Sequence, residues 1–182
     1  FKRFSWDLSN MVGPSPRWGR WENADLTADE RALCDKALWK AMDVVVKVPR
    51  TRQTWGLIHA DLRPSNVIKG PDGKLTVIDF DDAGYSWYLY DYASSLSFIE
   101  HEPYAPQLAK AWVRGYQKVA GDFNEEQLAV MSALSMIRRL QMLGWTTNHR
   151  ADALPDGMAE QEAPGSVMCA KRYLDNPMWL LE

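Results

Sequence analysis

Polar residues that could do chemistry gather in two short segments of the sequence. His59, Asp61 and Asn66 lie in the segment HADLRPSN, directly after a short apolar run, and Asp79 follows a second apolar run. Two carboxylates and an amide oxygen form an all-oxygen set of donors, which suits a hard cation such as Mg2+ and not Zn2+. The pattern therefore indicates chemistry on phosphate groups.

Short predicted strands precede both segments. The predicted strands cover 55–58, 67–69 and 75–80. The turn sequence Gly-Pro-Asp-Gly at 70–73 separates the second strand from the third. Side chains at the carboxyl ends of neighbouring strands are held rigidly while they face solvent. We therefore expect Asp61, Asn66 and Asp79 to converge on one ligand.

Helical patterns dominate the rest of the chain. Thr27 and Glu30 have the form of a capping box, and apolar residues then recur at helical spacing as far as Pro49, which predicts a helix over 28–48. Further helices are predicted at 87–99, 105–119, 125–147 and 165–175. The expected organisation is one domain, with an ordered connecting segment at 1–25, a helix plus strand-loop region at 28–80 and a helical subdomain at 85–182.

Composition excludes several classes of protein. The 182 residues are 46% hydrophobic, which is enough for a real core and excludes intrinsic disorder as the main state. A net charge of -3 gives no reason to expect nucleic acid or a membrane surface as a partner. No apolar run approaches the roughly 18 residues that a membrane-spanning helix needs.

The cysteines and the amino terminus bear on location and completeness. Cys34 and Cys169 show no metal spacing and are too few for a disulfide framework, so we expect buried thiols in a reducing compartment. No export signal is visible, and the cytoplasm is the expected location. The chain begins with Phe1 in place of an initiator Met. We therefore expect a piece of a longer protein.

The segments HADLRPSN and VIDFDDAG together resemble the catalytic and metal-binding loops of the protein-kinase-like fold. Within that fold they are most similar to the aminoglycoside/choline/homoserine phosphotransferase group. Asp79 follows Asn66 by thirteen residues, and agreement between two separated motifs is more specific than one glycine-rich loop. The resemblance implies an α+β, mostly α fold: the carboxyl-terminal, larger lobe, in which a small strand cluster carries both loops.

The resemblance also implies an activity and roles for residues. It implies an ATP-dependent, Mg2+-requiring kinase that transfers the terminal phosphoryl group to a hydroxyl of a small molecule. Asp61 would accept or orient the proton of the attacking hydroxyl, and Asn66 with Asp79 would hold Mg2+ on the ATP phosphates. His59 would brace the loop. Arg63 occupies the catalytic-loop position where protein kinases often carry a Lys that contacts the transferred phosphate, whereas many small-molecule kinases have His there.

Residues after the second motif bear on the acceptor. No long activation segment ending in Ala-Pro-Glu follows Asp79, which favours a small-molecule acceptor over a protein. By resemblance, Asp91 would open a helix and brace the catalytic loop as structural support. Asp81 and Asp82 fit a solvated turn and a patch for a cationic substrate equally well.

The resemblance covers only half of the kinase-like fold. The sequence contains no glycine-rich phosphate loop and no assignable strand Lys with a helix Glu partner, so the amino-terminal nucleotide lobe is expected to be absent and the chain alone inactive. Apolar surface left by that lobe predicts self-association. Two alternatives stay open: a non-catalytic kinase-like binding or dimerisation module, and a bacterial-type protein Ser/Thr kinase, which Arg63 keeps in consideration.

Two further charged groups are predicted to be structural. Arg138 and Arg139 are interpreted as a pair on a helix surface. Glu100, His101 and Glu102 are interpreted as solvated loop residues, because three adjacent residues rarely point to one metal centre.

Overall fold

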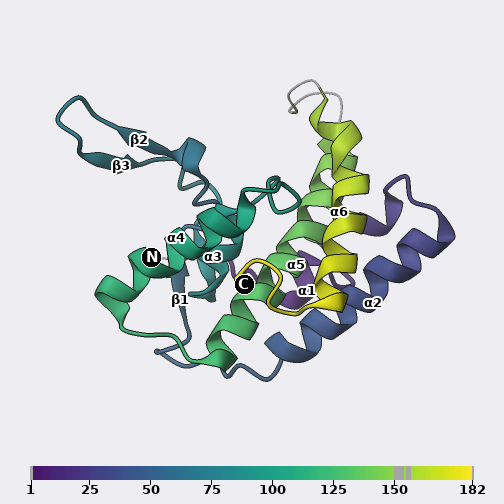
Figure 1. Cartoon of the computed structure of the whole chain (residues 1–182), viewed down its shortest axis with the longest axis horizontal. Coiled ribbons are helices and arrows are strands. Elements are labelled where there is room, and N and C mark those ends of the chain that lie inside the picture. The colour runs from purple at the N-terminus through teal and green to yellow at the C-terminus, as the bar shows by residue number, and fades with distance from the viewer. Residues whose placement is uncertain (1, 150–153, 155–156, 182) are drawn as a thin grey trace.

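The computed structural model describes residues 2–149, 154 and 157–181. Within these residues the chain is mostly helical and carries two separate two-stranded antiparallel sheets (Figure 1). The α-helices are α1 (Leu8–Met11), α2 (Ala28–Val45), α3 (Tyr90–Ser95), α4 (Ala105–Ala120), α5 (Glu125–His149) and α6 (Met158–Asp175). The strands are β1 (Trp55–Ile58), β2 (Val67–Lys69), β3 (Leu75–Val77) and β4 (Gly84–Trp87), and short 3-10 turns cover Trp21–Asn23 and Pro64–Asn66.

Helix α5 is the central helix, around which most of the other helices pack. Every residue from 130 to 144 is buried, and the helix packs against α2, α3 and α6 (Figure 1). Residues on every side of α5 are buried, so the helix needs neighbours all round, and this requirement places it at the centre. Gly144 lets the amino-terminal segment cross it, because a Cβ there would lie 2.4 Å from the carbonyl oxygen of Gly19. None of the described helices is long and apolar enough to cross a membrane.

Helix α2 begins at the predicted capping box. Glu30 N donates to Thr27 Oγ1 at 3.3 Å, and Thr27 N donates to Glu30 Oε2 at 2.9 Å. The helix ends at Val45, so the prediction for 28–48 is confirmed apart from the last turn. Cys34 and Cys169 are buried free thiols, as predicted.

The sheet of β1 and β4 supports the loop that follows β1. The two strands pair antiparallel, with Ile58 opposite Gly84. The amino-terminal segment lies along the other edge of β4, where Trp6 N donates to the carbonyl oxygen of Tyr85 at 2.8 Å. The loop after Ile58 therefore begins from a strand that is held in place along one edge of a short sheet.

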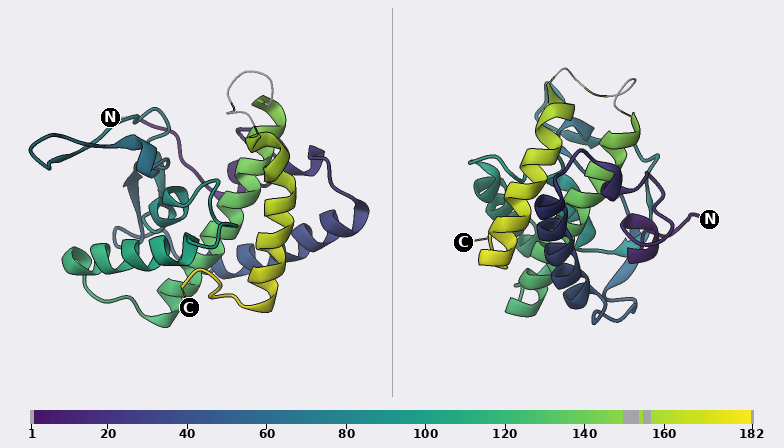
Figure 2. Two further views of the ribbon diagram at one scale, coloured as in Figure 1. Left: turned by 45° about the horizontal axis from the view of Figure 1, so that its top comes forward. Right: turned by 90° about the vertical axis from the view of Figure 1, so that its right-hand side faces the viewer.

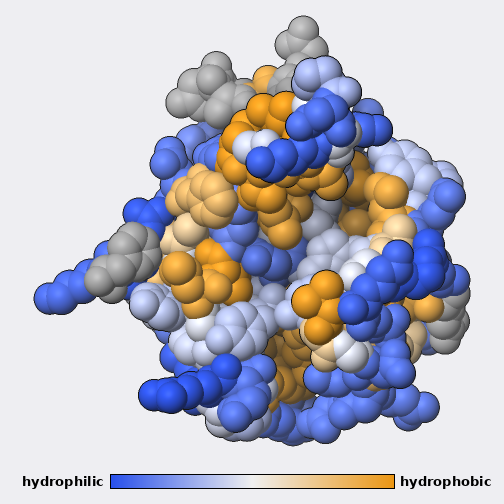
Figure 3. Space-filling model, turned by 90° about the vertical axis from the view of Figure 1, so that its left-hand side faces the viewer, coloured by the Kyte–Doolittle hydropathy of each residue, from blue (hydrophilic) through white to orange (hydrophobic). Residues whose placement is uncertain are grey.

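Strands β2 and β3 form a hairpin that projects from the body of the molecule (Figures 1 and 2). Figure 3 looks onto the side from which the hairpin projects and shows apolar surface gathered there. The hairpin and the residues after it expose five apolar side chains to solvent: Ile68, Leu75, Val77, Ile78 and Phe80. We call these residues the apolar hairpin face.

Several predicted boundaries were wrong. Strand β4 occupies the start of the helix predicted at 87–99, because Trp87 pairs with Trp55 of β1 and this pairing overrides the local periodicity. Helix α3 ends at Ser95, short of the predicted end. Helix α6 begins at Met158, upstream of the predicted start at 165, and includes Pro164. Strand β3 ends at residue 77, before the predicted end at 80.

A buried ion cluster joins α5 to α6. Arg139 Nη1 lies 3.0 Å from Glu100 Oε2, and Arg139 Nη2 lies 3.3 Å from Glu162 Oε1. Arg139 Nε donates to Ser166 Oγ at 2.9 Å, and a Cβ at Gly165 would lie 2.6 Å from Arg139 Nη2. The predictions of a surface position for Arg139 and a solvated one for Glu100 are wrong, since both side chains are fully buried. Charges at such positions must pair, because an unpaired charge is costly to bury.

This cluster predicts a pH-dependent stability. Burial raises the pKa of Glu162 from 4.5 to about 7, Arg139 opposes the rise, and Glu100 adds to it. Between these two values the folded state keeps a proton that the unfolded state has lost, so stability falls as pH rises from about 4.5 to about 7. The variant Glu162→Gln keeps the neutral shape and should be more stable than the parent at pH 8, by up to about 3 kcal/mol, with no gain at pH 4.

Urea unfolding across this pH range measures the effect. Glu160→Gln is the matched control, because Glu160 is exposed on the same helix. Parallel stability profiles for the parent and for Glu162→Gln would contradict this account of the cluster.

Candidate active site

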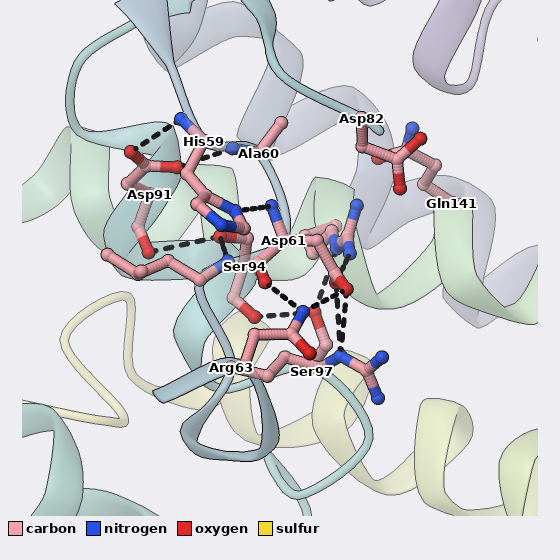
Figure 4. Close-up of polar contacts among 12 residues, drawn as sticks. His59, Ala60, Asp61, Arg63, Asp82, Asp91, Ser94, Ser97 and Gln141 are labelled. Carbon is pink, nitrogen blue, oxygen red and sulfur yellow. Dashed lines mark hydrogen bonds and ion pairs between the residues drawn. The ribbon is translucent and has the colours of Figure 1, made fainter. Parts of the chain in front are cut away.

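Asp91, the second residue of α3, holds the loop that follows β1 (residues 59–66, the first loop). Its Oδ2 accepts a hydrogen bond from His59 N at 3.1 Å, and its Oδ1 accepts one from Ala60 N at 2.7 Å. Figure 4 shows the Asp91 carboxylate turned toward these two backbone groups. The helix therefore fixes the point where the chain leaves β1 for the first loop.

The backbone at this point is strained. Ala60 has φ of 66°, in the left-handed region that costs a non-glycine residue about 1–2 kcal/mol. Burial raises the pKa of Asp91, while the N–H groups of His59 and Ala60 favour its charged form. Ser94, one turn further along α3, accepts from Leu62 N at 3.1 Å. These bonds keep the strained turn in one conformation.

Removing the Asp91 carboxylate is expected to release the first loop. Asp91→Ala leaves the N–H groups of His59 and Ala60 without their acceptor. We expect a loss of about 2–3 kcal/mol in the free energy of unfolding. Ser94→Ala is the milder control, because a single backbone N–H of the first loop, that of Leu62, loses its acceptor, and the carbonyl oxygen of Asp91 loses the Ser94 hydroxyl as a donor. Urea unfolding with equal losses for both variants would contradict a bracing role for Asp91.

The carboxylate of Asp61 is nearly buried, with 8% of the residue exposed, and three side chains bind it. Arg138 Nη2 lies 2.9 Å from Oδ1, and Asn66 Nδ2 donates to Oδ2 at 2.9 Å. Arg63 Nε bridges the two oxygens at 3.1 and 3.2 Å (Figure 4). Two cations and an amide thus contact this carboxylate before any ligand binds.

Backbone and ring contacts join the first loop to the loop after β3 (residues 78–83, the second loop). His59 Nε2 lies 2.9 Å from the carbonyl oxygen of Ile78. Ile78 N donates to the carbonyl oxygen of Asn66 at 3.0 Å. Asp79 follows Ile78 directly, so this bond joins Asn66 to the residue that precedes Asp79.

Asn66 and Asp79 fit a divalent cation by their chemistry. Asn66 Nδ2 donates to the main-chain and side-chain oxygens of Asp61, which leaves Asn66 Oδ1 free to act as a ligand to a cation. Asp79 is exposed, and no hydrogen bond or ion pair within the described residues holds its carboxylate. Its φ of 63° is one that Asp tolerates better than most residues. Two oxygen donors of this kind suit Mg2+, with the remaining positions open to phosphate oxygens and water.

Asp81 and Asp82 differ in their surroundings. Trp6 Nε1 donates to the carbonyl oxygen of Asp82 at 2.8 Å, which anchors the second loop to the amino-terminal segment. Burial raises the pKa of the Asp82 carboxyl, and the carboxylates of Asp61 and Asp79 act in the same direction. Asp81 is exposed. Asp82 therefore shares the electrostatic environment of Asp61, and Asp81 faces solvent.

Arg138 is the residue that the sequence reasoning missed. It was interpreted as a surface residue, yet it is 1% exposed and bonds to Asp61. Its Nε donates to Ser97 Oγ at 2.8 Å and its Nη1 to the hydroxyl of Tyr90 at 3.0 Å. A signal was present, because Arg138 lies among the apolar residues Met136, Ile137 and Leu140 of the predicted helix. A cation in such a segment has to find buried partners.

Comparison with known proteins identifies the family. Residues 1–130 match the model of the phosphotransferase enzyme family (APH). Amicoumacin kinase of Bacillus subtilis (strain 168) is 29% identical over 110 residues, which are 59% of this chain and 32% of that protein. The structure of a microcompartment-associated aminopropanol kinase superposes with a TM-score of 0.84 at 34% identity, over 98% of this chain and 56% of that one.

A second solved structure shares the fold. Amicoumacin kinase hAmiN, in complex with AMP-PNP, Ca2+ and Ami, matches with a TM-score of 0.63 at 19% identity, over 93% of this chain and 51% of that chain. The chain thus spans from about a third to about half of the length of these relatives. The predicted mostly helical α+β domain is confirmed as a match to part of these kinase structures. The family model covers more than half of the chain, which therefore belongs to the phosphotransferase enzyme family.

Proposed function

We propose that this chain is the catalytic carboxyl-terminal lobe of an ATP-dependent, Mg2+-requiring kinase that phosphorylates a hydroxyl group of a small molecule. The observation that carries the proposal is the double role of Asn66. Its side-chain Nδ2 donates to Asp61, and its main-chain carbonyl oxygen accepts from the N–H of Ile78, the residue before Asp79. A base and two metal-type oxygen donors thus lie on two joined loops, as phosphoryl transfer requires.

Asp61 is the group that meets the acceptor. The acceptor hydroxyl would take the lone pairs that Arg63 Nε now occupies on the Asp61 oxygens. The oxygen of the acceptor hydroxyl would form a bond to the terminal phosphorus of ATP, while the bond from that phosphorus to the bridging oxygen of the leaving ADP breaks. The proton of the hydroxyl would pass to Asp61. Arg63, released from the carboxylate, is then free to face the phosphoryl oxygens.

Asn66 Oδ1 and the Asp79 carboxylate are the residues that would hold Mg2+. Bound there, the ion supplies neutralisation of the charge on the ATP phosphates. The protein contributes the alignment, because Asn66 is itself oriented by two bonds to Asp61. Two observations support this assignment: both residues offer oxygen ligands, and a main-chain hydrogen bond joins the two loops that carry them.

A small amino alcohol is the acceptor class that we propose. The relative with the TM-score of 0.84 is an aminopropanol kinase. Asp81 is exposed and Asp82 is partly buried on the second loop, and a carboxylate of this loop is the group that we propose for an ammonium group. Aminopropanol is therefore the first acceptor to test.

The apolar hairpin face is proposed to pack against an amino-terminal nucleotide lobe. Five apolar side chains of this face are exposed, from 38% for Ile78 to 63% for Leu75. Exposed apolar groups at this density are typical of a surface that another surface covers. We call this chain together with such a lobe the complete enzyme. The same face also favours the second candidate function, a non-catalytic module that dimerises through it.

Calorimetric titration of Mg-ATP separates the two candidates. The titration is made into this chain and into a version extended upstream in its gene, followed by phosphoryl transfer to aminopropanol. Binding and transfer by the extended protein alone would support the complete enzyme. Binding by neither protein, with dimerisation of this chain in light scattering, would favour the non-catalytic module.

A further inference from the structure

Arg138 reaches the first loop from the middle of the central helix. Its side chain is 1% exposed, and its Nη2 lies 2.9 Å from Asp61 Oδ1. The ring of Trp18 lies 5.0 Å from the guanidinium carbon, and the ring of Tyr90 lies 5.7 Å from it. Aromatic rings flank the cation and limit the access of water, so its bond to Asp61 forms in surroundings of low dielectric constant.

Helix α3 and the turn after it hold the guanidinium group in addition to its bond to Asp61. Arg138 Nε donates to Ser97 Oγ at 2.8 Å, and Nη1 donates to the Tyr90 hydroxyl at 3.0 Å. The Tyr90 hydroxyl in turn donates to Gln141 Oε1, and Gln141 lies three residues after Arg138 in α5. A planar fork with a separate partner on each nitrogen can occupy only one position. The position of Asp61 Oδ1 is thereby tied to α5.

Arg63 contacts the same carboxylate but cannot fix it. Its side chain is 32% exposed and stands two residues from Asp61 in the same loop, so it moves with the loop. Its Nε also fills lone pairs that an incoming hydroxyl needs. Of the two cations that contact Asp61, only Arg138 anchors the carboxylate to the buried core.

We propose that Arg138 is a positioning residue that holds the Asp61 carboxylate in the orientation needed for phosphoryl transfer, and this rests on the proposed function. Its contribution goes through Asp61 and not through contact with the phosphates. Orientation of reacting groups accounts for large factors in rate, and a displacement of about 1 Å can cost about 10²-fold.

Kinetics of the complete enzyme with Mg-ATP and aminopropanol provide the first test. Arg138→Met should lower kcat by about 10²-fold with KM for ATP unchanged, because the nucleotide contacts are untouched. Arg138→Lys should lower kcat by about tenfold, since one ammonium cannot serve Asp61, Tyr90 and Ser97 together. In an Asp61→Asn background, Arg138→Met should change kcat by less than about twofold.

Unfolding of this chain provides the second test and needs no activity. The variants are Arg138→Met, Asp61→Asn and the double variant. Each single variant leaves one buried polar partner of the pair unmatched, so the two losses in stability should sum to more than the loss in the double variant. The same cycle with Arg63→Met, at a side chain that is 32% exposed, should be close to additive.

The two tests separate failure of this inference from failure of the proposed function. Absence of turnover by the parent enzyme with every acceptor would count against the proposed function, and the unfolding cycle would still decide whether Arg138 and Asp61 are coupled. Additive losses in the Arg138 cycle would overturn the inference. An equal drop in kcat in the Asp61→Asn background would also overturn it, because Arg138 would then act without Asp61. If Arg138→Met does not fold, Arg138→Lys carries both tests.

Discussion

Replacing Asp61 with Asn is expected to lower kcat of the complete enzyme by about 10²- to 10⁴-fold while Mg-ATP binding is retained. Asn keeps the size of the side chain but has no charge and cannot take up the proton of the acceptor hydroxyl. The geometry supports a specific loss at the chemical step, because the Asp61 carboxylate is held by Arg138 and Asn66 and is nearly buried. Steady-state kinetics and calorimetry with Mg-ATP measure the two effects separately.

The matched control for this experiment is Asp35→Asn. Asp35 is exposed on α2, outside both loops, and should leave kcat unchanged. Turnover by Asp61→Asn within a few-fold of the parent would show that Asp61 does not receive the acceptor proton. The proposed mechanism would then need another base.

Replacing Asp79 with Asn is expected to abolish metal-dependent binding of ATP. Removing a group that only supports a metal ligand typically costs about 10- to 100-fold in affinity, and loss of a direct ligand should cost at least as much. Asn is the suitable change, because Asp79 has φ of 63° and Asn tolerates this conformation about as well as Asp. Calorimetric titration of ATP with and without Mg2+ into the extended protein measures the loss.

Asp72→Asn is the matched control for Asp79. Asp72 lies in the turn of the β2–β3 hairpin, where its Oδ1 accepts from Lys74 N at 3.0 Å, and Asn can make the same bond. Near-parental Mg-ATP affinity in Asp79→Asn would remove Asp79 from the metal site. Asn66 alone would then be a poor site for Mg2+, which prefers several oxygen ligands.

The two motif loops and most helices were predictable from local sequence. The capping box at Thr27 and Glu30, and the Gly-Pro-Asp-Gly turn, act through bonds between residues close in sequence. The first loop follows β1 and the second follows β3, as predicted. Local signals of this kind need no knowledge of the rest of the fold.

The strand β4 and the start of α6 were not predictable in the same way. Gly84 to Trp87 is a strand because β1 and the amino-terminal segment lie on its two sides. Pro164 stays inside a helix although its ring removes one backbone hydrogen bond. Arg139 binds the carbonyl oxygen of Glu162 at 3.0 Å, close to that proline. Partners distant in sequence decided β4, and the buried Arg139 contacts α6 next to Pro164.

Two separated motifs were enough to indicate the family and to single out Asp61, Asn66 and Asp79 as candidates, because the residue types and their spacing are specific. How Asp61 is held depends on contacts between segments far apart in the sequence. Arg138 lies 77 residues from Asp61 in the sequence, so no local pattern could pair the two side chains. Packing of α5 on all sides buried it, and a buried cation must pair with whatever carboxylate the fold brings near.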